Sequence, residues 1–234
     1  EMTSSLVGSE MCIRDRARRT LALSINADEN EIFITSGGTE SDNWALKMTA
    51  AEHKNGHIIT TKIEHHAIIR TCEYLENNGI DVTYVDTDEY GNVNVADIAA
   101  AIRPETFLIS VMAANNEIGT IQPVERIAGI AKRQNILFHT DAVQAYTNIP
   151  IDVKRQNIDM LSTSAHKICG PKGIGFLYIR NGTLKTPFIN GGGQENGMRS
   201  GTENVAGIIG FAKAAAIATV SYTHLRAHET RRHL

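Results

Sequence analysis

Long apolar runs and paired cysteines are both missing from this 234-residue sequence. No run reaches about 18 apolar residues, the length from which a membrane-spanning helix is inferred, so no membrane segment is predicted. The cysteines are Cys12, Cys72 and Cys169, an odd number without paired spacing. This pattern argues against a disulfide framework or a zinc cluster, and it favours a reducing cytoplasmic location.

An excess of positive charge is also absent. The formal net charge is -3 and no basic stripe stands out, which argues against a nucleic-acid partner. Neither a GxGxxG nor a GKS/T motif occurs, so the usual dinucleotide and P-loop sites are not indicated. Hydrophobic residues make up 42% of the chain, which is enough for a globular protein with a sizeable core.

The two ends differ in composition from the middle. The first 16 residues contain a short apolar patch with no basic region ahead of it, which does not fit a secretory signal peptide. The last 14 residues, "SYTHLRAHETRRHL", have no hydrophobic period. Both ends look like translated library-adapter sequence; ordinary disordered tails are the alternative. We therefore predict non-native or disordered tails at 1–16 and 221–234, and one domain over 17–220.

Between these ends, short apolar runs alternate with helical patterns. This order predicts an α/β fold, in which a mostly parallel sheet has helices on both faces. Strands are expected at 31–35, 57–60, 81–86, 106–113, 136–141, 159–164 and 173–180, and helices at 40–54, 67–79, 94–104 and 124–135. Ligands of such sheets bind outside the carboxyl ends of the strands, so the residues that follow each strand are the candidates for a site.

The segment "TSGGTESDN" (35–43) follows the first predicted strand. Glycines allow a ligand to approach the backbone closely, and the N–H groups of a first helical turn favour an anion. A helix N-cap with a tight turn explains Ser36, Thr39 and Glu40 equally well without a ligand.

Asp141 and Lys167 follow two later strands. A carboxylate at the end of an apolar strand needs a cation or hydrogen-bond donors; a helix cap or a structural salt bridge is the alternative to a ligand. Lys167, in "SAHKICG", must lose a proton to attack a carbonyl, which burial and neighbouring cations favour. An ordinary surface lysine is the alternative.

An anion cradle, a carboxylate and a lysine at one sheet edge match the requirements of pyridoxal phosphate (PLP). This cofactor needs an anchor for its phosphate, an acidic partner for its ring nitrogen, and a lysine for its aldehyde. The three features together therefore indicate a PLP site.

Six blocks in order then resemble the cysteine desulfurase family, among the class V, fold-type I PLP enzymes. They are "SGGTESDN", "EHHAI", "NNEIGTIQP", "HTDAVQ", "SAHKICGPKGIG" and "GGGQENGMRSGTEN", and the resemblance covers most of residues 17–213. It implies that residues 17–220 form the large PLP-binding domain of such an enzyme. Related selenocysteine lyases share many of these blocks.

The resemblance implies a role for each matching residue. Lys167 would bind the cofactor aldehyde, Asp141 would pair with the ring nitrogen, and His65 would stack on the ring and take part in proton transfer. His65 is preferred to His66 because it follows Glu64 as in the family pattern. Contacts on the ring hydroxyl side are implied for Asn116 and Gln144, and phosphate contacts for Gly38, Thr39, Ser164 and His166. Thr202 would reach the phosphate of a partner subunit, which implies a homodimer.

Some family features have no counterpart in the sequence. The mobile loop with the sulfur-accepting cysteine, the opening segment with an asparagine, and the arginine for the substrate carboxylate are not found. Cys169 lies two residues after Lys167, but free cysteines are usually buried and inert, so we do not assign it this role. Cys72 is predicted to be a core residue.

The expected function is that of a cytoplasmic PLP-dependent cysteine desulfurase. Such an enzyme converts L-cysteine to L-alanine and transfers sulfur to an acceptor or scaffold protein, for iron–sulfur clusters or other sulfur compounds. Three alternatives remain: a fragment that binds PLP without turnover, a selenocysteine lyase, and an α/β interaction domain without cofactor. Sulfide or alanine release from L-cysteine separates the first alternative from the enzyme.

Overall fold

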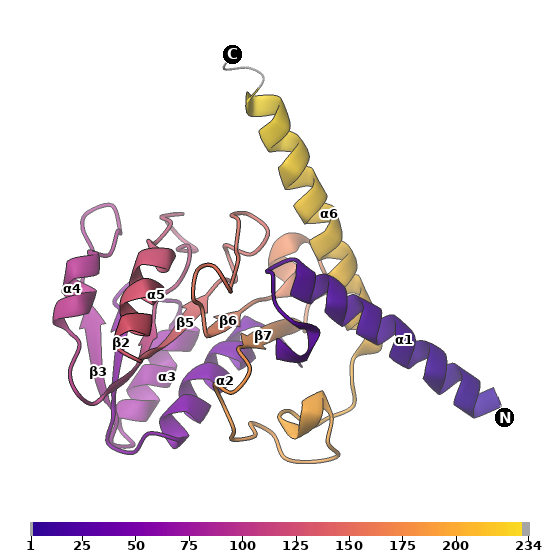
Figure 1. Cartoon of the computed structure of the whole chain (residues 1–234), viewed down its shortest axis with the longest axis horizontal. Coiled ribbons are helices and arrows are strands. Elements are labelled where there is room, and N and C mark those ends of the chain that lie inside the picture. Colours follow the sequence, from indigo (N-terminus) through magenta and orange to yellow (C-terminus); the bar gives the residue numbers. More distant parts are fainter. Residues whose placement is uncertain (1, 231–234) are drawn as a thin grey trace.

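The structure, a computed structural model, describes the backbone of residues 2–230 and the side chains of residues 12–219. Short runs rich in β-branched and apolar residues form a single sheet (Figure 1). Its strands are β1 (Ile32–Thr35), β2 (His57–Thr61), β3 (Asp81–Val85), β4 (Thr106–Ser110), β5 (Leu137–Asp141), β6 (Met160–Ser162) and β7 (Gly175–Ile179). Their order across the sheet is β1-β7-β6-β5-β4-β2-β3.

Strand direction determines where a site can form. The pairs β2–β3, β2–β4, β4–β5 and β5–β6 are parallel, whereas β7 is antiparallel to both β6 and β1. It follows that β7 alone runs in the opposite direction, and that the other six strands end at the same edge. The segments after β1, β2, β4, β5 and β6 therefore meet at this edge.

Helices cover both faces of the sheet. Alternate strand residues face opposite layers, since Ile58 packs in the core with Trp44 and Ile68, while Ile59 packs in the core with Ile127 and Phe211. The first layer contains α2 (Gly38–Ala51) and α3 (His66–Glu76), and the second contains α1 (Met2–Leu23), α4 (Val95–Ala100), α5 (Val124–Arg133) and α6 (Val205–Thr230). Figure 1 shows α1 and α6 side by side near β7, with α4 at the far end of the sheet. Three short 3₁₀ helices complete the fold within residues 2–230: η1 (Glu29–Glu31), η2 (Ala165–Ile168) and η3 (Glu195–Gly197).

The predicted fold class is confirmed, because the sheet is mostly parallel and has helices on both faces. The predicted tail boundaries do not coincide with the ends of elements. One helix runs through position 16 as α1, and α6 continues beyond position 220. Residues 231–234 lie outside the described residues, and the origin of the tails stays a prediction. Within the described part of the chain, no helix is long and apolar enough to cross a membrane.

Candidate active site

A pocket of about 180 Å³ lies at the edge where the six co-directional strands end. Segments from five strand ends contribute to its walls, which is why residues far apart in sequence meet there. Nine of the ten residues predicted for the site line it: Gly38, Thr39, His65, Asn116, Asp141, Gln144, Ser164, His166 and Lys167. The tenth, Thr202, is exposed and lies outside this lining, so its predicted contact with a partner subunit stays a prediction.

The amino terminus of α2 forms one wall. Gly37 precedes the helix with a φ of 148°, a value that favours glycine, and no side chain caps the helix. Gly38 permits close approach, because a Cβ there would lie only 2.6 Å from Val143 Cγ2. An uncapped amino terminus presents unpaired N–H groups and positive potential, and it therefore suits an anion.

The segment after β6 lies next to this wall, since a Cβ on Gly37 would be 3.5 Å from the Ser164 Oγ. The Ser164 hydroxyl lies 2.7 Å from His166 Nδ1, and His166 and Lys167 belong to the 3₁₀ helix η2. Burial, followed by the positive charge of Lys167, lowers the pKa of His166, so this imidazole is neutral at pH 7. Lys167 lines the pocket but is exposed, so the burial that we expected for it from the sequence is not found.

Asp141 lies at the bottom of the pocket, at the end of β5, and only 5% of the residue is exposed. Its Oδ1 accepts a hydrogen bond of 2.8 Å from the Val143 N–H. Burial raises the pKa of Asp141, whereas this hydrogen bond and the neighbouring His65 and Lys167 side chains act in the opposite direction. A buried carboxylate of this kind is most stable when a positive group occupies the pocket above it.

His65 begins α3 as its N-cap, and its Nδ1 accepts a hydrogen bond of 3.1 Å from the Ala67 N–H. In the neutral ring the proton is therefore on Nε2, which is the nitrogen free to donate. His66 is the first residue of the helix and does not line the pocket.

Asp42 is a pocket residue that the sequence analysis missed. It is 1% exposed, and its Oδ1 has no hydrogen-bond partner among the described residues. Burial, and then the charge of Asp141, raises the pKa of Asp42 well above its ordinary range, so we assign the proton of this acid pair to Asp42. Its position was the available signal, since Asp42 is a charged residue one turn after Gly38 on the buried stripe of α2.

Ligand atoms of Asp42, His65 and Asp141 lie within 4.8 Å of one another. This donor set fits a metal ion poorly, because the Ala67 N–H occupies one ring nitrogen of His65 and the other has the proton. Asp42, with its raised pKa, is also a poor ligand, because a coordinating carboxylate must be deprotonated. An organic cation such as a protonated ring nitrogen suits the pocket better.

Behind the pocket, two further titratable groups are neutral at pH 7. Burial raises the pKa of Glu64 to about 8, although its Oε1 accepts hydrogen bonds from the Met112 N–H and the Thr61 hydroxyl. Burial lowers the pKa of His139 to about 3. Asp141 is therefore the carboxyl of this region that we expect to be ionised.

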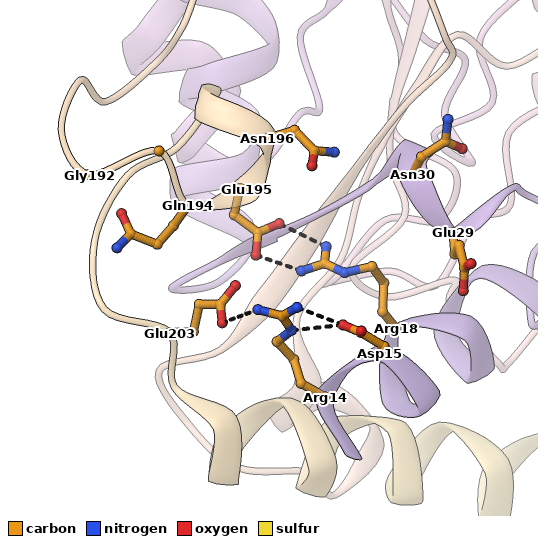
Figure 2. A pocket seen from close by; sticks show the side chains of 11 residues that line it. Arg14, Asp15, Arg18, Glu29, Asn30, Gly192, Gln194, Glu195, Asn196 and Glu203 are labelled. Carbon is orange, nitrogen blue, oxygen red and sulfur yellow. Dashed lines mark hydrogen bonds and ion pairs between the residues drawn. The ribbon is translucent and has the colours of Figure 1, made fainter. Parts of the chain in front are cut away.

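A larger cavity, of about 440 Å³, lies between α1 and the loop of residues 192–203 (Figure 2). Its two arginines are already paired. Arg18 forms two hydrogen bonds with Glu195, of 2.7 and 2.8 Å, and Arg14 pairs with Glu203 and Asp15. Carboxylates of the same lining occupy both arginines, so we assign this cavity a structural role in holding the loop against α1.

Comparison with known proteins agrees with the geometry. Residues 2–233 match the family model described as aminotransferase class-V. The chain belongs to this family. It is 57% identical over 204 residues to the cysteine desulfurase IscS of Clostridium botulinum, and 56% identical over 205 residues to that of Methanosarcina thermophila. These alignments cover 86% and 87% of this chain and 51% of each relative.

Two solved structures share the fold of this chain. A NifS-like protein superimposes with a TM-score of 0.89 at 45% identity, over 92% of this chain and 60% of that protein. A structure described as SspA in complex with cysteine gives a TM-score of 0.87 at 44% identity, over 90% and 62% of the two chains. The chain thus spans about half the length of the curated relatives it matches.

Proposed function

We propose that the protein represented by this chain is a PLP-dependent cysteine desulfurase, which converts L-cysteine to L-alanine and passes the sulfur to an acceptor. The observation that supports this most directly is the convergence of three groups in one pocket: the exposed amine of Lys167, the buried carboxylate of Asp141, and the uncapped amino terminus of α2. Similarity to cysteine desulfurases over 204 residues supports the same conclusion.

The pocket residues fit PLP group by group. The cradle at Gly38 accepts no side chain, and with Thr39, Ser164 and His166 it would hold the phosphate. Asp141 would accept a hydrogen bond from the protonated ring nitrogen, and Lys167 would bind the aldehyde. Gln144 and Asn116 line the same pocket and would contact the ring hydroxyl side.

When bound, the cofactor supplies an electron sink for the α-carbon of the amino-acid substrate. The chain supplies the positions and the proton transfers. The Ala67 N–H occupies Nδ1 of His65, so the neutral ring presents its Nε2–H to the pocket as a hydrogen-bond donor. A proton taken up by this ring would go to Nδ1, which requires the hydrogen bond from Ala67 to open. Asp141 holds the negative charge at the bottom of the pocket, because its neighbours Asp42 and Glu64 are protonated at neutral pH.

A specific observation also favours the alternative of cofactor binding without turnover. Cys72 is buried and Cys12 and Cys169 are exposed, and none of the three lines the pocket. Sulfur abstraction requires a thiol at the bound substrate, so we propose that this chain binds PLP and releases little alanine from L-cysteine. A selenocysteine lyase stays a further alternative, which rates on the two substrates would separate.

We further propose a homodimer, in which Thr202 of one subunit reaches the phosphate site of the other. Its exposure outside the pocket of its own subunit is compatible with such a contact. The acceptor would be a sulfur-carrier or iron–sulfur scaffold protein in the cytoplasm. The relatives are named cysteine desulfurases, and an enzyme that removes sulfur from cysteine needs an acceptor for that sulfur.

The test is covalent trapping of the cofactor. The purified chain is mixed with PLP, reduced with borohydride and digested, and the labelled peptide is identified by mass spectrometry. We expect the label on Lys167 and its loss in Lys167→Ala. The matched control is Lys172→Ala, which removes an exposed lysine outside the pocket lining and should leave the label in place. A label on another lysine, or none, would contradict the proposal.

A further inference from the structure

Glu40 and Arg199 form an ion pair beside the proposed phosphate cradle. Glu40 lies in the first turn of α2, directly after the pocket residues Gly38 and Thr39. Arg199 Nε donates to its Oε1 at 2.8 Å and Nη2 to its Oε2 at 3.2 Å. The side chains are 14% and 22% exposed, so water screens the pair only partly.

The position of Glu40 raises an electrostatic problem. Its Oε2 also accepts a hydrogen bond from the N–H of Ser36, two residues before Gly38, so the carboxylate is held close to the amino terminus of α2. Burial acts to raise the pKa of Glu40, but the hydrogen bonds from Arg199 and Ser36 outweigh burial, and the pKa is lowered. Glu40 is therefore ionised at neutral pH, and without its partner it would repel an anion at the cradle.

We propose that Arg199 is a positioning residue that cancels the charge of Glu40, so that the amino terminus of α2 stays available to a phosphate dianion. The inference rests on the proposed function, because it concerns the phosphate of PLP. Arg199 acts through Glu40 and does not line the pocket itself.

Anchoring of the loop is the competing explanation, because Arg199 also ties residues 192–203 to α2. The backbone holds this loop independently. The Phe188 N–H donates to the Met198 carbonyl, and the Ser200 N–H to the Ile189 carbonyl. The Arg18–Glu195 pair fixes the loop to α1 (Figure 2). We therefore expect the loop to keep its fold when the Arg199 side chain is removed.

The two explanations predict different orders of PLP affinity for three variants. Charge cancellation predicts about tenfold weaker PLP binding in Arg199→Ala and equal or tighter binding in Glu40→Gln. In the double variant, which has both substitutions, the PLP affinity should return to within about threefold of the parent value. Loop anchoring predicts weaker binding in all three, because each breaks the same tether.

Dissociation constants are measured from the visible absorption of the bound cofactor, at one pH and one salt concentration. Pyridoxal, which lacks the phosphate, serves as the matched ligand. Its affinity should change by less than about twofold across the three variants, since the effect acts on the phosphate charge. The control variant Arg103→Ala breaks an ion pair with Asp81, at the opposite edge of the sheet, and should leave both affinities unchanged.

Weaker PLP binding in Glu40→Gln, no recovery in the double variant, or an equal loss for pyridoxal would each overturn the inference. Limited proteolysis of the cofactor-free variants provides a second measurement, and new cleavage within 192–203 in Arg199→Ala would also overturn it. Failure of the proposed function itself looks different, because the unsubstituted chain would then show no cofactor label on Lys167.

Discussion

Replacing Glu64 by glutamine should make the cofactor-free protein more stable at alkaline pH. Glu64 is 6% exposed, and burial raises the pKa of its carboxyl from 4.5 to about 8. Between these two values the folded protein retains a proton that the unfolded chain has released. The free energy of unfolding therefore falls as the pH rises through this window, and the loss is complete above pH 8.

The size of the effect follows from the two pKa values. Their difference corresponds to an upper bound of about 5 kcal/mol, at about 1.4 kcal/mol per pH unit. Glutamine has no charge to bury, and its amide oxygen can accept the same hydrogen bonds from the Thr61 hydroxyl and the Met112 N–H. We therefore expect Glu64→Gln to match the parent near pH 4.5 and to exceed its unfolding free energy by about 3–5 kcal/mol at pH 8.5.

The assay is urea unfolding of the cofactor-free protein at about pH 4.5, 6.5 and 8.5. These values cover the range over which the Glu64 carboxyl titrates. Glu52→Gln is the matched control with the opposite sign. Hydrogen bonds from Lys185 and Thr186 outweigh burial and lower the pKa of Glu52, so this variant should lose stability above pH 4.5 and match the parent at lower pH. If Glu64→Gln and the parent gave a constant difference at all three pH values, the carboxyl would not titrate as described.

Three further outcomes concern the pocket. Asp141→Asn should weaken PLP binding by about 10- to 100-fold, since a buried hydrogen bond to a charged group contributes about 1.5–3 kcal/mol. The control Asp159→Asn breaks an ion pair outside the pocket, so it should lower the unfolding midpoint and leave the PLP affinity unchanged. Equal PLP affinities in the two variants would refute the role of Asp141. Gly38→Ala should weaken PLP binding by at least about tenfold because its Cβ would lie 2.6 Å from Val143 Cγ2, and unchanged binding in a titration would show that the cradle is not used. Cys169→Ser should leave the affinity within about twofold, since this thiol lies outside the pocket, and a larger loss would give Cys169 a binding role.

Much of the site followed from one rule applied to the sequence. Apolar strands in βα order predict a mostly parallel sheet, and the carboxyl ends of such strands meet at one edge. Residues after the predicted strands, such as His65, Asp141 and Lys167, were therefore expected together, and they line one pocket. Periodicity reflects burial on each face of a strand, so the strands were the most predictable elements.

Other features depend on tertiary contacts that no local pattern encodes. The run at 173–180 predicted a strand, but its antiparallel insertion between β6 and β1 depends on pairing with two distant partners. Asp42 was missed because its burial results from packing of α2 on β5 and β6. The exposure of Lys167 reflects the short 3₁₀ helix η2, which holds it at the rim of the pocket.

We propose that one pocket of this chain holds PLP by an amine, a carboxylate and a helix amino terminus, and a crystal structure of the chain with PLP would show whether it does. We expect density continuous with Lys167 Nζ, the ring nitrogen within about 3 Å of an Asp141 oxygen, and the phosphate at Gly38 and Thr39. A ring bound in this pocket with its phosphate away from α2, or a cofactor bound in the cavity beside Arg18, would contradict it.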